Sequence, residues 1–209
     1  MTRPSDTRLL VLHGLRLKGF AVAHDVTSVV GVPPDEVGSH LEQLQGDELV
    51  LYRDGRLTGF ALTPAGRAEH ERLLAAELDS NGCRAAIEGA YRRFLGLNPD
   101  LLTVCTAWQM KDDGTLNAHD DLAYDGAVID DLGELHVRVD PVLADLEGAM
   151  LRYQSYRPRF DNALDRVRAG GPEWFAKPMI DSYHTVWFQL HEDLLNTLGI
   201  ERSKEVTHS

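Results

Sequence analysis

The most constraining feature of the chain is a short β-prone stretch, enclosed by helical patterns. Residues 49–52 (LVLY) and 57–63 (LTGFALT) are two apolar or β-prone runs on either side of an Asp54-Gly55 pair. Asp and Gly both tolerate the positive φ that a tight hairpin turn requires, so this pair between two such runs is a strong hairpin signal. The stretch predicts one β-hairpin in a chain whose other patterns are helical.

Three helical patterns precede the hairpin and one follows it. Apolar residues at helical spacing predict helices over residues 7–19, 23–30 and 34–45. After the hairpin, Thr63 suits an N-cap and Pro64 suits the first turn of a further helix, because proline needs no amide donor there. The order helix, helix, helix, hairpin, helix is that of a winged helix.

A run of polar turn-formers at residues 79–82 (DSNG) marks the predicted boundary between a winged-helix domain, residues 1–80, and a second domain, residues 81–209. In the second domain, helical periodicity covers residues 83–95 and 99–110, and a polar loop follows. Residues 122–169 predict two or three helices, with Pro141 starting one of them and Pro158 interrupting near another boundary.

The last predicted helix has the clearest apolar stripe, made of Tyr183, Trp187, Leu190, Leu194 and Leu198. This stripe is either packed within the chain or forms the seam of a homodimer. The expected fold is therefore mainly α with a small β-hairpin wing: a winged helix-turn-helix followed by an all-helical C-terminal domain.

Composition limits the function classes. The formal net charge is −12, and both predicted domains carry more Asp and Glu than Lys and Arg: twelve against eight in residues 1–80, and 21 against 13 in the remainder. Neither is a basic domain of the kind that usually holds phosphate backbones. No run of eighteen apolar residues and no N-terminal signal pattern occurs, so we expect a cytoplasmic protein without a membrane partner.

Motifs for catalysis, metals and cofactors are absent from the sequence. Cys83 and Cys105 have no second pair, so they suggest neither a zinc ribbon nor a disulfide framework. Four histidines in the second domain invite a metal-site interpretation, but His184 and His191 are seven residues apart, whereas a metal pair on one helix usually has a spacing of three or four. We expect no enzyme activity, no metal and no cofactor.

Two motifs carry a family resemblance. Residues 46–50 (GDELV) and 62–67 (LTPAGR) resemble the wing and following helix of MarR-like bacterial transcription regulators. In such regulators the third helix enters the DNA major groove and the hairpin tip contacts the backbone or minor groove. The resemblance implies DNA contacts within residues 34–45 and 53–56. Our candidate DNA-binding residues are Ser39, His40, Gln43, Arg53, Arg56, Arg16 and Lys18.

The same third helix also supports a different interpretation. Asp35, Glu36 and Glu42 would repel phosphates, and a solvated acidic face is suited to protein contacts. A local basic strip at Arg53 and Arg56 could still hold DNA on an acidic protein. Both alternatives stay open at this point.

A second resemblance covers more of the chain. Residues 16–20 (RLKGF), 97–99 (LNP), 105–109 (CTAWQ) and 180–188 (IDSYHTVWF) are similar to a region found beside phosphohistidine-carrying domains in some actinobacterial pyruvate phosphate dikinase-like proteins. The Gly-rich motif around the phosphorylated histidine is missing, so no phosphoryl-transfer role passes to a residue. The resemblance implies an accessory module that works with an enzyme partner.

Large aromatic residues concentrate in the second domain and are either core or the lining of a small-molecule pocket. The candidate pocket residues are Trp108, Trp174, Tyr183, His184 and Trp187. The leading hypothesis is a dimeric DNA-binding transcriptional regulator whose helical domain senses an effector or supplies the dimer seam. The alternative is an accessory subunit that uses the winged helix for protein contacts with a dikinase-like phosphoryl-transfer or carboxylation enzyme system.

Overall fold

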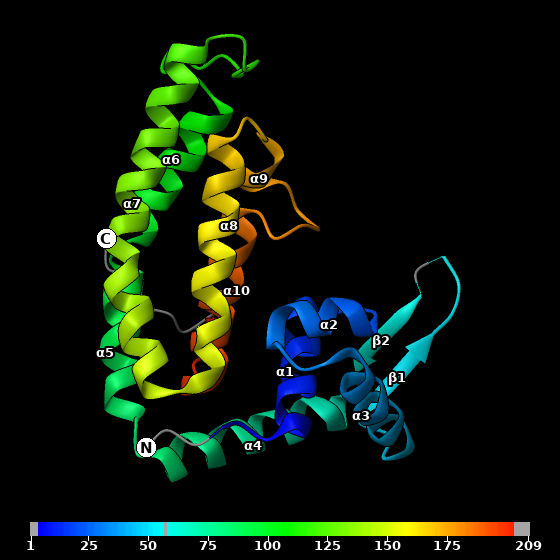
Figure 1. The fold of residues 1–209 in the computed structure, drawn as a ribbon. Coiled ribbons are helices and arrows are strands. Elements are labelled where there is room, and N and C mark those ends of the chain that lie inside the picture. The colour runs from blue at the N-terminus through cyan, green and yellow to red at the C-terminus, as the bar shows by residue number, and fades with distance from the viewer. Residues whose placement is uncertain (1–3, 57, 203–209) are drawn as a thin grey trace.

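The computed structural model describes residues 4–56 and 58–202 of the 209-residue chain (Figure 1). Residue 57, which the sequence assigns to the second β-prone run, lies outside the described residues. The N-terminal part follows the predicted winged-helix order, with elements α1 (Thr7–Lys18), α2 (Ala23–Val30), α3 (Pro34–Gly46), β1 (Val50–Arg53), β2 (Gly59–Leu62) and α4 (Pro64–Asn81).

The hairpin is a two-stranded antiparallel sheet with Val50 opposite Leu62 and Arg53 opposite Gly59. Ala21, between α1 and α2, adds an isolated antiparallel bridge to Phe60, with backbone N–H···O distances of 3.0 and 2.8 Å. This bridge ties the base of the wing to the helices. The winged-helix core is formed by buried residues of α1, α2, α3 and the hairpin, among them Leu12, Val26, Leu41, Val50 and Leu62.

The start of α4 shows why the sequence needs a Thr-Pro-x-Gly pattern here. The Thr63 hydroxyl caps the helix by accepting a hydrogen bond from the amide of Gly66 at 3.0 Å, and Pro64 occupies the first turn. Gly66 lies directly against the hairpin: a Cβ atom at this position would be only 1.9 Å from the carbonyl oxygen of Leu49. Only glycine therefore lets α4 pack this closely on the strand.

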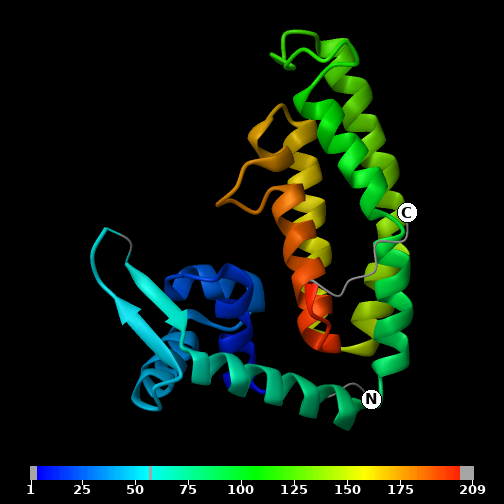
Figure 2. The same ribbon diagram turned by 180° about the vertical axis from the view of Figure 1, so that it is seen from behind.

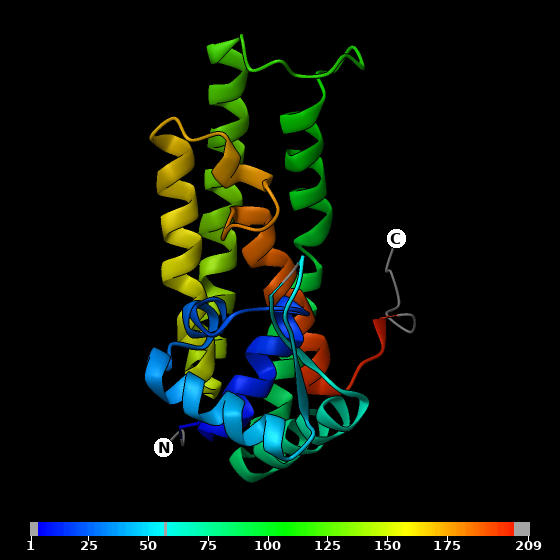
Figure 3. The same cartoon turned by 90° about the vertical axis from the view of Figure 1, so that its right-hand side faces the viewer.

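The remaining elements are all helical: α5 (Arg84–Leu95), α6 (Asn98–Gln109), α7 (Leu122–Ala149), the 3-10 turn η1 (Leu151–Ser155), α8 (Tyr156–Arg168), the short α9 (Glu173–Ala176) and α10 (Tyr183–Leu198). Helices α7, α8 and α10 and the α5–α6 column stand side by side as an upright bundle (Figure 3). The fold is mainly α with a small hairpin wing, as predicted.

Helix α7 corrects one prediction. Pro141 does not begin a helix, because α7 runs without a break from Leu122 to Ala149. A proline inside a helix removes the amide that would bond the carbonyl four residues earlier, here that of Val137. Both residues are exposed, so water can satisfy this carbonyl. Pro158 lies in the first turn of α8, where its missing amide costs nothing.

Helix α4 connects the two parts of the molecule. It runs from the wing to the base of α5, and Figures 1 and 2 show the hairpin projecting away from the bundle. Leu78 of α4 packs in the bundle core, although the sequence division places it in the first domain. Helices α1 and α4 both contact α10. Of the helices that the structure describes, none has the length and apolar character needed to cross a membrane.

Candidate functional site

The surface of α3 is acidic. Ser39 and Gln43 are exposed, but the Ser39 hydroxyl already donates to the carbonyl of Asp35 at 2.9 Å. His40 is half-buried, and its Nδ1 atom has no partner among the described residues. Asp35, Glu36 and Glu42 are exposed on the same helix, which contains no Lys or Arg. Helix α3 by itself therefore offers a polyanion no positive charge.

The wing supplies two exposed positive charges. Arg53 at the end of β1 and Arg56 in the turn are both exposed. The turn is held by Asp54, whose carboxylate accepts a hydrogen bond from the Thr58 hydroxyl at 3.2 Å. The wing and α3 lie on the side of the winged helix away from the bundle (Figures 1 and 2). Two solvent-accessible guanidinium groups are thus presented on a projecting element.

Arg16 and Lys18 of α1 are engaged differently. The Lys18 ammonium lies 3.5 Å from a carboxylate oxygen of Asp181, just before α10, and its side chain is largely buried. Burial would raise the pKa of Asp181, but hydrogen bonding and charge attraction from Arg159, assisted by Lys18, hold that pKa below its ordinary value. Arg16 is half-buried, and its charge acts on the buried His70. The structure therefore holds Lys18 against the segment before α10, apart from the wing arginines.

A cluster of buried charges lies where the winged helix meets the bundle. His13 of α1 places Nε2 3.0 Å from Oδ2 of Asp193 on α10, with side-chain exposures of 4% and 2%. Arg152 of η1 forms an ion pair with the other Asp193 oxygen and contacts Glu77 of α4 at 3.2 Å. We call His13, Glu77, Arg152 and Asp193, together with His70, the junction network. Its members come from both parts of the molecule.

Hydroxyl groups complete the coordination of Asp193. Tyr156 donates to Oδ2 at 2.9 Å and Thr197 donates to Oδ1 at 3.0 Å. Burial would raise the pKa of Asp193, yet charge attraction and hydrogen bonding from Arg152 and His13 hold the pKa well below its usual range. The carboxylate stays ionised inside the protein because its oxygens are fully paired.

His70 of α4 is the neutral end of the junction network. Its Nε2 lies 3.0 Å from Nδ1 of His13, and the two rings are stacked. Burial lowers the pKa of His70 to about 2, and repulsion by the charges of His13, Arg16 and Arg152 acts in the same direction. His70 therefore stays uncharged at neutral pH. The five side chains of the junction network thus form one continuous contact between the winged helix and the bundle.

The aromatic residues proposed as a pocket are not gathered in one place. Tyr183 and Trp187 are buried in the bundle core, where the Trp187 indole N–H donates to Asn98 at 2.8 Å. His184 is exposed, and Trp174 lies under the guanidinium of Arg166. Of the five, Trp108 lines a cleft at the end of α6.

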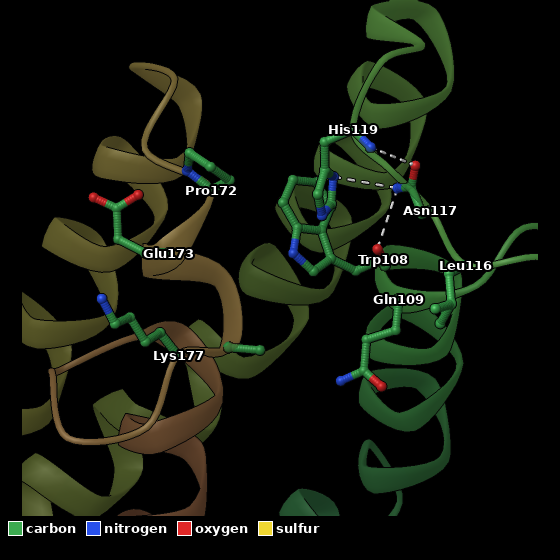
Figure 4. Close-up of a pocket in the computed structure, with 9 residues that line it drawn as sticks. Trp108, Gln109, Leu116, Asn117, His119, Pro172, Glu173 and Lys177 are labelled. Carbon is green, nitrogen blue, oxygen red and sulfur yellow. Dashed lines mark hydrogen bonds between the residues drawn. The ribbon is translucent and has the colours of Figure 1, made fainter.

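This cleft has a volume of about 580 Å³ and opens between the end of α6, the loop after it and α9 (Figure 4). Its lining combines apolar and polar side chains: Trp108, Gln109, Leu116, Asn117, His119, Pro172, Glu173, Ala176 and Lys177. Short α9 and the loop after α6 carry weak sequence patterns, so sequence reasoning found only Trp108.

One wall of the cleft is fixed by a buried amide and a carboxylate. Asn117 donates to the backbone carbonyl of Trp108 at 3.1 Å and to Asp125 at 2.7 Å, and it accepts from the backbone amide of His119 at 3.1 Å. His119 also places Nδ1 3.1 Å from Asp125. These contacts hold His119 at a φ of 58°, a conformation that costs a non-glycine residue of order 1 kcal/mol.

Metal and thiol chemistry find little support in the arrangement of side chains. In residues 4–56 and 58–202, no three His, Cys, Asp or Glu side chains are grouped so that they could hold a metal ion. Cys83 and Cys105 are free, and burial raises the pKa of the Cys105 thiol to about 11. Neither thiol is primed as a nucleophile at neutral pH.

Comparisons with known proteins identify no relative. The chain matches no protein-family profile, no curated protein and no solved structure.

Proposed function

We propose that the chain is a DNA-binding transcriptional regulator with a MarR-like winged helix and a helical effector or dimerisation domain. The observation that carries the proposal is the presentation of α3 and the wing. They lie together on the side away from the bundle, with Arg53 and Arg56 exposed on the projecting hairpin. Winged helices use these two elements for the major groove and for the adjacent backbone or minor groove.

The acidity of α3 shapes the expected binding mode. Ser39 and Gln43 are suited to hydrogen bonding at base edges, while the attraction to phosphate comes from Arg53 and Arg56. With so few cations, a single copy would bind weakly. A dimer that places two wings on one DNA segment would double the number of phosphate contacts, which is the usual arrangement for such regulators.

The test is binding to DNA fragments selected from a random pool, followed by fluorescence anisotropy over a range of salt concentrations. We expect the affinity to fall as salt rises, and the double variant Arg53→Ala, Arg56→Ala to lose at least about tenfold in affinity. A matched control is Arg84→Ala, Arg92→Ala, which removes the same charge from exposed positions on α5. The proposal would be overturned if the affinity for DNA did not depend on salt concentration and the two double variants bound DNA equally well.

The acidic surface of α3 favours a second candidate function. Asp35, Glu36 and Glu42 are exposed without a Lys or Arg on the helix, which suits a basic protein surface better than a phosphate backbone. In this case the chain is an accessory subunit of a dikinase-like phosphoryl-transfer or carboxylation enzyme system. The variant Glu42→Lys separates the two functions: it should strengthen DNA binding in the first and weaken binding to such an enzyme from the same host in the second.

A further inference from the structure

We propose that the cleft between α6 and α9 binds a small organic monocarboxylate with an apolar body, held by the indole N–H of Trp108 and the ammonium of Lys177. Its role as an effector site would rest on the proposed regulatory function. The binding itself does not, because the cleft lies in the helical bundle and is complete without DNA.

The first observation is an unused hydrogen-bond donor. Trp108 is only 6% exposed as a residue, but its indole N–H is not one of the fully buried atoms: it opens to the cleft and has no acceptor among the described residues. Figure 4 shows the indole nitrogen on the edge of the ring that faces Lys177 across the cleft. The indole N–H of Trp187, by contrast, is already used, because it donates to Asn98 at 2.8 Å. An acceptor on a bound molecule would satisfy it.

The second observation is that the donor is held in place before any ligand arrives. The indole is stacked at 4.3 Å on Phe175, with an interplanar angle of 4°. The imidazole of His119 lies 4.4 Å from the same indole, measured between ring centroids, and Asn117 holds the backbone carbonyl of Trp108. Because these neighbours occupy the ring, a ligand can use only its N–H edge. Fixing the donor beforehand lowers the entropic cost of binding.

The charges of the cleft select a singly charged anion. Lys177 is exposed at the rim, and among the described residues no carboxylate lies within 4.0 Å of its ammonium. Glu173 is also exposed in the cleft and would repel a dianion such as a phosphate more strongly than a monocarboxylate. Asp125 is not part of the lining: its carboxylate accepts a hydrogen bond from Asn117 at 2.7 Å and lies 3.1 Å from Nδ1 of His119.

The remaining lining selects an apolar body. Leu116 is 80% exposed, Pro172 stands on the opposite side of the cleft, and Ala176 also lines it. A ligand whose hydrocarbon part touches these side chains removes their apolar surface from water, at about 25 cal/mol per Å². Small-molecule sites commonly combine a hydrophobic lining with a few polar groups. Here the polar groups are one hydrogen-bond donor and one cation, and the walls are apolar.

The test is isothermal titration of the full chain with hexanoate and benzoate, and with hexanamide and benzamide as neutral analogues of the same shape. We expect both acids to bind at millimolar concentration or below, and each amide to bind at least about tenfold more weakly. Two variants address the two polar contacts. Trp108→Phe keeps a ring for stacking on Phe175 and removes the N–H, and Lys177→Met removes the charge and keeps the length; each should weaken acid binding by about tenfold.

The control variant is Arg92→Met, which removes an exposed cation of α5 that does not line the cleft, and it should bind the acids as the wild type does. Thermal unfolding of each variant checks that the bundle is intact. The proposal is overturned if neither acid binds, if the amides bind equally well, or if Lys177→Met retains wild-type affinity. If the acids bind but leave the affinity for DNA unchanged, the cleft is a binding site without an effector role. This outcome differs from one in which the chain fails to bind DNA, which would contradict the proposed function and not the site.

Discussion

The imidazole Nε2 of His13 lies 3.0 Å from the Asp193 carboxylate, joining the first helix of the chain to the last. Arg152 binds the other oxygen of Asp193, and all three side chains are buried. Charged groups withdrawn from water in this way lose their hydration and depend on one another for compensation. The orientation of the winged helix on the bundle is therefore coupled to the pairing of these charges.

The variant Arg152→Met is expected to destabilise the protein by about 3–5 kcal/mol, because it leaves Asp193 charged and buried without its main partner. Adding Asp193→Asn to the same chain should recover part of this loss, since the unpaired charge is then removed. Urea unfolding followed by circular dichroism measures both. The control is Arg93→Met, which breaks an exposed ion pair with Asp145 and should cost less than about 1 kcal/mol. Equal losses at Arg152 and Arg93 would contradict the prediction.

The free energy of unfolding is expected to fall between about pH 8 and pH 5 because of His70. Burial lowers the pKa of His70 to about 2 in the folded protein, whereas in the unfolded chain the ordinary value of about 6.5 applies. Below pH 6.5 the unfolded chain thus binds a proton that the folded protein excludes, and stability decreases with acid. For one group the loss at pH 5 is about 2 kcal/mol.

Urea unfolding of His70→Gln at both pH values tests this origin. In this variant the difference in the free energy of unfolding between pH 8 and pH 5 should be smaller by about 2 kcal/mol. In His24→Gln, at an exposed position on α2, the difference should equal that of the wild type. The lowered pKa of Asp193 also makes stability fall with acid, but that loss begins only near the ordinary carboxyl pKa of about 4, below the tested range. If His70→Gln and the wild type show the same difference between pH 8 and pH 5, His70 is not the cause.

The variant Gly66→Ala should destabilise the winged helix by about 2 kcal/mol or more, since the new methyl group would meet the Leu49 carbonyl oxygen at 1.9 Å. Gly89→Ala is a control in which the change in stability should have the opposite sign. Gly89 lies inside α5, and a Cβ atom added there would have no neighbour within 4 Å, so alanine should stabilise the protein by about 0.5–1 kcal/mol. Thermal unfolding of the two variants should shift the midpoint in opposite directions; two shifts of the same sign would count against the close packing of α4 on Leu49.

The winged-helix order could be predicted from sequence because its signals are local. Thr63, Pro64 and Gly66 act within one helix turn and one strand end, and the Asp54-Gly55 turn closes its own hairpin. The failed prediction at Pro141 has a tertiary cause, because packing of the other faces of α7 carries the helix through a proline that a local pattern treats as a boundary.

The junction network and the cleft could not be found from sequence. His13 and Asp193 stand beside apolar residues of their helices, where a polar residue at the edge of a stripe usually faces water. Only the docking of α1 on α10 turns them into a buried pair. The cleft depends on the irregular loop after α6 and on the four-residue α9, neither of which carries a periodic pattern.

The contact between Lys18 and Asp181 leads to a prediction that separates two basic residues proposed for the same role. If the chain binds DNA through its wing, Arg53→Ala should weaken binding by about fivefold, the effect of losing one charged phosphate contact. Lys18→Ala should change DNA affinity by less than about twofold, because its ammonium is held 3.5 Å from Asp181 and its side chain is largely buried. Anisotropy titrations at one low salt concentration measure both, and a fivefold loss with Lys18→Ala would place α1 at the DNA after all.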